Sequence, residues 1–179
     1  NCDNYGITHI DYIPEGITSL LCLGNKLTEL PKLPDNLKTL NCTDNNLTSL
    51  PKLPESLGHL SCYNNQLTEL PNLPDSLINL YCYNNQLTEL PKLPESLISL
   101  NCRNNKLTEL PKLPDSLVEG LNCRNNKLTE LPILPENLER LNCQYNDNLP
   151  YEITINNIKE HNNKIKLIKR KEIIKRICT

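Results

Sequence analysis

Nine cysteines are the first candidates for chemistry in this chain of 179 residues. Eight recur every 20 residues, apart from one step of 21. Such a column could form disulfides, bind a metal or supply nucleophiles. The spacing matches no common zinc signature, because zinc ligands usually stand only a few residues apart. We interpret these cysteines as reduced core residues, which predicts a reducing compartment such as the cytosol. They are Cys2, Cys22, Cys42, Cys62, Cys82, Cys102, Cys123 and Cys143.

The remaining residues of catalytic type form no recognisable set. His9, His59 and His161 lie far apart, and no Ser or Cys has a His within the same coil that is placed to act as its base. No Gly-rich loop could hold a phosphate group. For Cys178 we favour an unreactive thiol over a reactive or lipidated one. The sequence therefore predicts a protein that is not an enzyme and uses no cofactor, no metal and no small-molecule substrate.

The cysteines belong to a tandem repeat. Residues 37–47 read L-x-x-L-x-C-x-x-N-x-L, and an L-P-x-L-P ending follows. The composition agrees, since the chain has 35 Leu but no Phe, Trp, Met or Ala to build an ordinary core. The string resembles the LPX subclass of leucine-rich repeats, known from bacterial type III secreted effectors and related microbial and viral proteins. The resemblance covers roughly residues 1–150 and implies an effector-like protein, acting in the cytoplasm of a host cell.

Some effectors of this subclass continue into a ubiquitin-ligase domain with a Cys-x-Asp nucleophile. Residues 151–179 contain no such motif, so that activity is not carried over. A repeat scaffold by itself serves many partners, because function lies in the residues that the scaffold presents. The resemblance therefore implies the fold, and the binding residues must come from the repeats themselves.

The repeat predicts a leucine-rich repeat solenoid over residues 1–150, with about eight coils, the first of them incomplete. Leu40 and Cys42 alternate, which points both side chains inward from a short strand that pairs in parallel with its neighbours. Parallel thiols in such a core lack the freedom to form a bridge. Pairs of prolines, as at Pro31 and Pro34, make the return leg extended or polyproline-like. We expect a weakly curved, right-handed solenoid with its strands on the concave face.

Two further columns and one irregularity concern the frame. An Asn follows seven of the repeat cysteines by three residues, from Asn25 to Asn146, where its amide can satisfy backbone groups of adjacent coils. We expect the Thr column, of which Thr28 is the first member, to act similarly on the return leg. One repeat holds an extra residue, and we expect Gly120 to form the bulge that absorbs it.

Recognition should lie where the repeats differ, at the outward positions beside the conserved Leu and Cys. These positions gather aromatic and cationic residues, the types most enriched at binding hot spots. Arg103 can stack on Tyr83, whereas Arg124 should repel Arg103 unless an anion or a carboxylate lies opposite. We predict that a protein partner, acidic on this argument, binds a monomer on the concave face. The predicted binding residues are Tyr63, Tyr81, Tyr83, Arg103, Arg124 and Arg140.

The tail, residues 151–179, differs in charge from the body. The net charge of −2 divides into −7 for residues 1–150 and +5 for the tail. We predict one or two short helices that cap the last coil, because solenoids need a cover over their open end. The alternative is an adaptor whose basic tail binds a membrane surface or a nucleic acid. The apolar residues expected to provide the cover are Ile153, Ile155, Ile158, Ile165, Leu167, Ile168, Ile173, Ile174 and Ile177.

Overall fold

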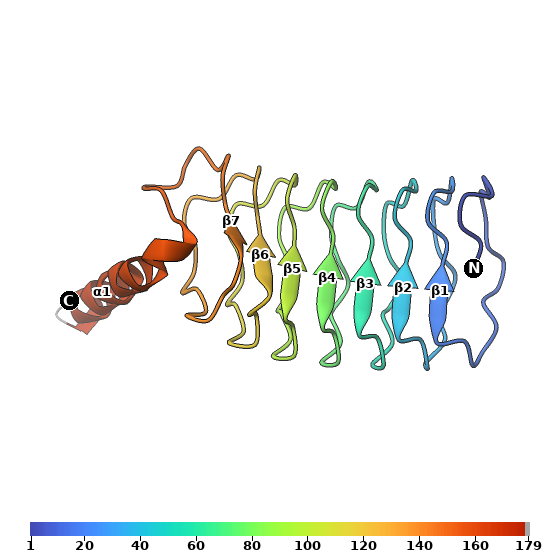
Figure 1. Ribbon diagram of the computed structural model, residues 1–179, viewed down its shortest axis with the longest axis horizontal. Coiled ribbons are helices and arrows are strands. Elements are labelled where there is room, and N and C mark those ends of the chain that lie inside the picture. The colour runs from blue at the N-terminus through green and yellow to red at the C-terminus, as the bar shows by residue number, and fades with distance from the viewer. Residues whose placement is uncertain (178–179) are drawn as a thin grey trace.

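Seven short parallel strands form one sheet in the computed structural model, which describes residues 1–177. The strands stand side by side in sequence order, in a row with little curvature (Figure 1). Residues 2–4 extend the sheet without a strand of their own, since the Cys2 N–H donates to the Leu21 carbonyl at 2.8 Å. The chain is thus a repeat solenoid, as predicted. Its strands are β1 (Ser19–Leu21), β2 (Thr39–Asn41), β3 (His59–Ser61), β4 (Asn79–Tyr81), β5 (Ser99–Asn101), β6 (Gly120–Asn122) and β7 (Leu141–Asn142).

The core is a stack of near-identical side chains. Leu40 pairs with Leu20 on one side and Leu60 on the other, so each central leucine lies over the next. The cysteine that follows each strand also points inward, and Cys42 is completely buried. Each buried leucine contributes about 1.5–3 kcal/mol through removal of apolar surface from water. Stability therefore accumulates coil by coil rather than in one central cluster.

The asparagine column makes the predicted ladder. In one coil, Asn45 accepts from the Leu27 N–H at 3.0 Å and donates to the Cys22 carbonyl of the same preceding coil at 2.9 Å. The same amide also donates to the Cys42 carbonyl within its own coil, at 3.2 Å. One side chain thus satisfies backbone groups in two coils. The contact between coils repeats along the solenoid through Asn25, Asn45, Asn65, Asn85, Asn105, Asn126 and Asn146.

A second ladder, absent from the sequence analysis, lies one residue earlier. These residues adopt the left-handed conformation, with φ of 53° at Asn84 and 54° at Asn104. Asparagine tolerates this conformation better than most residues. The side chains bond from coil to coil, since Asn84 donates to Asn64 and Asn125 donates to Asn104. In the turns after β3, β4, β5 and β6, two adjacent asparagines with different roles therefore fix the backbone.

In the return legs, serine hydroxyls rather than the expected threonine hydroxyls bond from coil to coil. Each leg contains a turn, in which the Leu57 N–H donates to the Pro54 carbonyl at 3.0 Å. The Ser56 hydroxyl then donates to the Asp35 and Leu37 carbonyls of the preceding coil, at 2.7 and 2.8 Å. The prediction for the Thr column is wrong, because Thr28 and its equivalents are exposed and their hydroxyls make no hydrogen bond between coils within residues 1–177. Serine in the turn performs this role instead.

The extra residue of the seventh repeat lies just before its strand. The Val118 N–H donates to the Ser116 carbonyl at 2.8 Å, which closes a tight local turn. Gly120 then takes an ordinary strand position opposite Ser99, so the expected bulge at this glycine is not formed. A Cβ atom at Gly120 would lie 3.4 Å from the Cβ atom of Arg140, which is an ordinary contact distance. The insertion leaves the sheet register intact.

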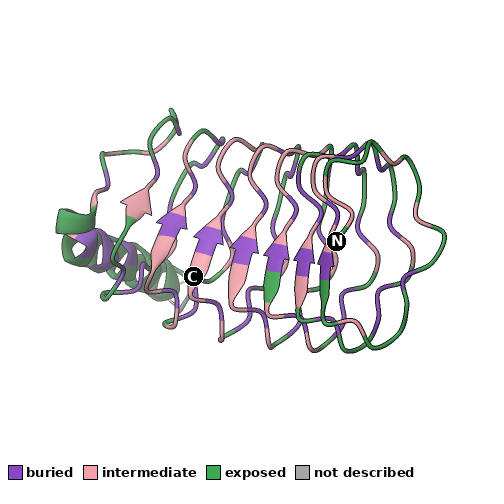
Figure 2. Ribbon diagram, turned by 45° about the vertical axis from the view of Figure 1, so that its right-hand side comes forward, coloured by how far each residue is buried: buried purple, intermediate pink, exposed green. Residues whose placement is uncertain are grey.

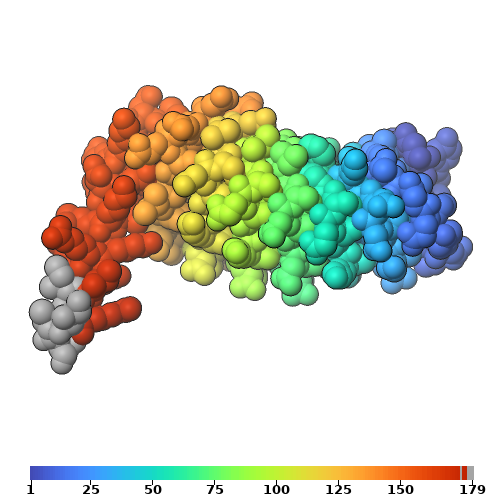
Figure 3. All heavy atoms as spheres, turned by 90° about the horizontal axis from the view of Figure 1, so that it is seen from below, coloured from blue at the N-terminus to red at the C-terminus, as the bar shows by residue number. Residues whose placement is uncertain are grey.

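The tail forms a short 3-10 helix, η1 (Ile155–Asn157), and one long helix, α1 (Ile158–Ile177). The first turns of α1 pack against the last coil and bury Ile158 and Ile165, and the preceding Ile153 is also buried. The rest of α1 extends beyond the solenoid (Figures 1 and 3), and most of the helix is coloured as exposed in Figure 2. Part of the predicted apolar cover is therefore wrong: Ile155, Leu167, Ile168 and Ile173 are 39–57% exposed.

The side chains of Ile174 and Ile177, and the whole of Cys178, lie outside what the structure describes. The predictions for them therefore stay predictions. Within residues 1–177, no helix combines the length and the apolar character that crossing a membrane requires.

Two buried polar residues of α1 tie the cap to the last return leg. Asn162 accepts from the Leu134 N–H and donates to the Leu134 carbonyl, both at 2.8 Å. His161 lies with Nε2 2.9 Å from the Pro132 carbonyl and Nδ1 2.9 Å from the Tyr151 hydroxyl. Since a carbonyl can only accept, Nε2 carries the proton. The two side chains thus join α1 to the backbone of the last return leg.

Candidate interaction surface on the strand face

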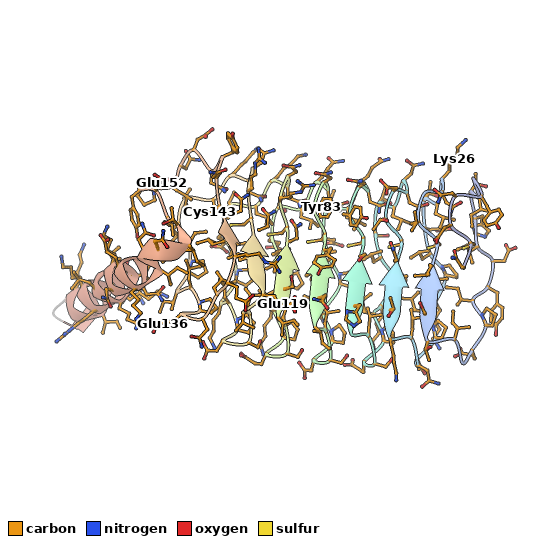
Figure 4. The ribbon with its side chains drawn as sticks, viewed as in Figure 1. Lys26, Tyr83, Glu119, Glu136, Cys143 and Glu152 are labelled. Atoms are coloured by element: carbon orange, nitrogen blue, oxygen red, sulfur yellow. The ribbon has the colours of Figure 1, made fainter. Side chains whose placement is uncertain are left out.

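A stacked row of side chains crosses the end of the strands. The Tyr63 and Tyr83 rings lie 4.2 Å apart at 9° to one another, and the Arg103 guanidinium lies 4.6 Å from the centre of the Tyr83 ring. The row follows from the repeat, since parallel strands about 4.8 Å apart place equivalent side chains at stacking distance. Tyr83 lies near the end of β4 (Figure 4). We call these three residues, with Arg124, the Tyr/Arg row.

Arg124 turns away from Arg103. Its guanidinium stacks on the ring of Tyr145, 4.6 Å from the ring centre. Tyr145 occupies the left-handed turn position of the last coil, with φ of 55°, where most other coils have asparagine. The two arginines thus stack on different rings, and this separates the guanidinium groups whose repulsion was predicted. The sequence analysis missed Tyr145, although an aromatic residue in the asparagine column was a visible signal.

The arginines of this face are not neutralised by the chain itself. The ion pairs of residues 1–177 join other side chains, none of them Arg103, Arg124 or Arg140. The Nε atom of Arg103 is buried and has no hydrogen-bond partner within the same residues. The row therefore presents positive charge that is available to an external anion.

The chemistry of Tyr83 reflects its place inside the row. Burial raises the pKa of Tyr83 to about 12, with smaller contributions from its hydrogen bond to Tyr63 and from the charge of that phenol. Asp44 also raises this pKa, whereas the charge of Arg103 lowers it. The phenol is thus neutral at physiological pH and offers a ring and a hydroxyl rather than a charge.

Tyr81 and Arg140 lie apart from the row. They line a shallow hollow of about 370 Å³ over β4 to β7, together with polar residues such as Asn101 and Asn122. The Nε–H of Arg140 donates to the Glu119 carbonyl at 3.0 Å, which holds the side chain above Gly120. Four of the six predicted residues thus form the Tyr/Arg row, and the other two belong to a separate hollow on the sheet.

The cysteines and histidines form no reactive arrangement. Burial raises the pKa of the Cys82 thiol to about 12 and holds the pKa of the Cys62 thiol well above its usual value, which keeps both thiols protonated. The Cys42 thiol donates to the Ser61 carbonyl of the next coil at 3.6 Å. His161 belongs to the cap, far from His9 and His59. Within the described part of the chain, no group of His, Cys, Asp and Glu could hold a metal ion.

Parallel strands one coil apart, a leucine and cysteine core and an asparagine ladder define the chain as a leucine-rich repeat protein. Its repeats are related to those of bacterial effectors. YopM from Yersinia enterocolitica WA-314 is similar, with 41% sequence identity and a TM-score of 0.73 over 77% of this chain and 31% of that one. YopM of Yersinia pestis, described as a leucine-rich effector protein, gives 40% identity and a TM-score of 0.77 over 81% and 42%.

The leucine-rich repeat domain of a Shigella effector is also similar, with 37% identity and a TM-score of 0.70 over 73% of this chain and 60% of that one. The chain thus spans between 31% and 60% of the length of these proteins. Comparison with protein-family models and with curated proteins gives no match. The relationship therefore concerns the repeats.

Proposed function

We propose that the chain is a non-enzymatic scaffold that binds a protein partner on its strand face, with the Tyr/Arg row as anchor. The observation that carries this proposal is the stacking of Tyr63, Tyr83 and Arg103, next to arginines that have no carboxylate partner in residues 1–177. A row fixed before binding loses little conformational entropy in the complex. Tyr81 and Arg140 would extend the contact area toward the centre of the sheet.

The partner surface should be acidic. Two arginines on adjacent coils, each stacked on a tyrosine, suit carboxylates that accept from a guanidinium. The effector-like repeats support a place of action in the cytoplasm of a host cell, where protonated core thiols would remain reduced. The proposal includes no catalytic step and no cofactor.

The test combines the Tyr83→Ala and Arg103→Glu substitutions. A protein captured from host-cell lysate on the wild-type chain, and identified by mass spectrometry, supplies the partner for a binding assay. The double variant should bind it about thirtyfold more weakly, because the substitutions remove a stacked anchor and reverse a charge. Its circular dichroism and melting temperature should stay close to those of the wild type, since the row lies outside the core.

Two single substitutions sharpen the result. Arg103→Glu should weaken binding more than Arg103→Ala if the partner is acidic. Glu89→Ala, an exposed change on the return leg, serves as the control and should have no effect. Equal losses from Glu89→Ala and from the double variant would move the binding surface off the strand face.

A second candidate is an adaptor that acts through the end of the basic tail. The observation in its favour is the exposed distal part of α1, where Leu167, Ile168 and Ile173 alternate with lysines and arginines. Removal of residues 166–179 separates this role from capping, because it leaves His161 and Asn162 in place. Loss of binding to anionic vesicles or to an oligonucleotide, without a fall in melting temperature, would favour the adaptor. A fall caused only by removal of residues 159–179 would favour a cap.

A further inference from the structure

The hydrogen bonds between coils alternate in direction along the strand face, because the Thr39 N–H donates to the Thr18 carbonyl of the preceding coil whereas the Cys42 N–H donates to the Ser61 carbonyl of the next one. In each coil, N–H groups that point toward the C-terminal side donate to carbonyl groups of the next coil. The Leu121 N–H donates to the Arg140 carbonyl, and the Cys123 N–H donates to the Asn142 carbonyl, both at 2.9 Å. The sheet therefore needs acceptors from a following coil at every step, and β7 has no such coil.

The cap does not supply these acceptors. Within residues 1–177, the N–H groups of Leu141, Cys143 and Tyr145 have no backbone or side-chain acceptor. His161 and Asn162 satisfy the return leg instead, and the Ile153 carbonyl accepts from the Cys143 thiol at 3.2 Å. The outer edge of β7 is thus an unpaired edge strand, the kind of site that accepts another strand.

A hollow of about 420 Å³ lies beside this edge. It is bounded by residues 141–147, by Leu149 and by residues 151–154, and Figure 4 shows Glu152 on the far side of Cys143 from the other strands. Leu141 is only half-buried there, whereas Leu121 in the preceding strand is 1% exposed. Asp147 and Glu152 line the hollow without a lysine or an arginine among its lining residues. The hollow therefore offers apolar surface and negative charge next to unpaired donors.

We propose that this edge is a second binding site, which takes an extended peptide segment of a partner protein as an eighth strand parallel to β7. The carbonyl groups of the segment accept from Leu141, Cys143 and Tyr145, as a following coil would. An apolar side chain of the segment covers Leu141, and a lysine or arginine faces Asp147 and Glu152. Strand addition of this kind takes affinity from the main chain and specificity from alternate side chains.

A labelled synthetic peptide with the sequence of residues 96–106 provides the probe, with Cys102 replaced by leucine to prevent disulfide exchange. This segment already pairs in parallel with β4 and carries Leu100, Arg103 and Lys106 in the required order. The peptide should bind the full chain in fluorescence anisotropy, and a scrambled peptide of equal composition should not. Amide hydrogen exchange at Leu141, Cys143 and Tyr145 should be fast in the free protein and slower with the peptide.

Leu141→Pro removes one outward N–H and should weaken peptide binding roughly tenfold or more. Should this variant melt early, Asp147→Lys decides, since it is expected to weaken binding through charge alone. The Tyr83→Ala and Arg103→Glu double variant should bind the peptide as the wild type does. A result against this proposal is therefore distinct from a result against the strand-face proposal. Equal binding of the scrambled peptide, or unchanged exchange at the three amides, would overturn the proposal. The proposal would also be overturned if the wild-type chain formed a dimer that Leu141→Pro dissociates, because a second copy of the chain would then occupy the edge.

Discussion

Asn84 and Asn85 are neighbours in the turn after β4, and they have different roles. Asn85 is buried and bonds to backbone groups of two coils, whereas Asn84 adopts the left-handed conformation and bonds mainly to the side chains above and below it. Asn85 is needed for its hydrogen bonds to the backbone. Asn84 is needed for its left-handed backbone conformation. Gly24 and Tyr145, which share the conformation of Asn84, show that this position accepts other residues.

Asn85→Ala should therefore lower the free energy of unfolding by about 1–3 kcal/mol, the cost of leaving buried backbone groups unpaired. Asn85→Asp should cost less than this if the acceptor for the Leu67 N–H matters most, because the carboxylate keeps that acceptor. Urea denaturation measures both variants. The exposed Gln86→Ala is the control, and an Asn85→Ala variant as stable as this control would show that the ladder contributes nothing.

At the scale of elements, the strands and the cap differ in how far the sequence predicts them. The strands can be predicted because Leu40 and its equivalents recur every 20 residues. Each of these leucines also alternates with a Cys two residues later, so both side chains point inward. The cap has no repeat. Its apolar residues suggested a cover, but not that α1 continues past Ile165 into solvent. Contacts such as Asn162 with Leu134 join irregular positions that no period relates, so they could not be predicted.

The candidate site divides in the same way. Stacking of Arg103 on Tyr83 was predictable, since the two residues hold equivalent places in adjacent coils. The stacking of Arg124 on Tyr145 was not, because it joins different places in the repeat and depends on the left-handed turn. Periodic reasoning therefore reaches contacts between equivalent residues and misses those between unlike ones.

Asn162→Ala tests the contribution of the cap. The Leu134 N–H and carbonyl would lose their partner in a buried position, so the free energy of unfolding should fall by about 1–3 kcal/mol. Thermal and urea denaturation provide the measurement. Asn163→Ala changes the next residue of the same helix, which is exposed, and should have little effect. If both variants lost the same amount, helix propensity rather than the cap contact would be responsible.

At the scale of the whole molecule, the buried thiols make stability depend on alkaline pH. Burial raises the pKa of Cys22 and Cys82 from 9.0 to about 12, and it raises the pKa of the other buried cysteines as well. Between these values the unfolded chain loses thiol protons that the folded chain keeps. The free energy of unfolding should therefore be at its full value below pH 9 and fall as pH rises toward 12.

The expected slope is about 1.4 kcal/mol per pH unit for each thiol that ionises on unfolding. Urea midpoints measured from pH 8 to pH 11 test this slope. The Cys82→Val substitution removes one thiol, so it should reduce the slope by the contribution of that thiol. Labelling with iodoacetamide in native buffer should modify the half-buried Cys2 before Cys62 or Cys82. A constant midpoint, or fast labelling of Cys62, would contradict protonated and buried thiols.

The sheet register survives the residue that is inserted near Val118, because each coil contains its own strand and its own turn. A gene for such a chain contains near-identical segments in tandem, which recombination can duplicate or delete in frame. Neighbouring coils would pair across the new junction as they did before. The length of the tyrosine and arginine row would change while the core did not. Copy number, as well as substitution, is therefore a route by which this protein can acquire a new binding partner.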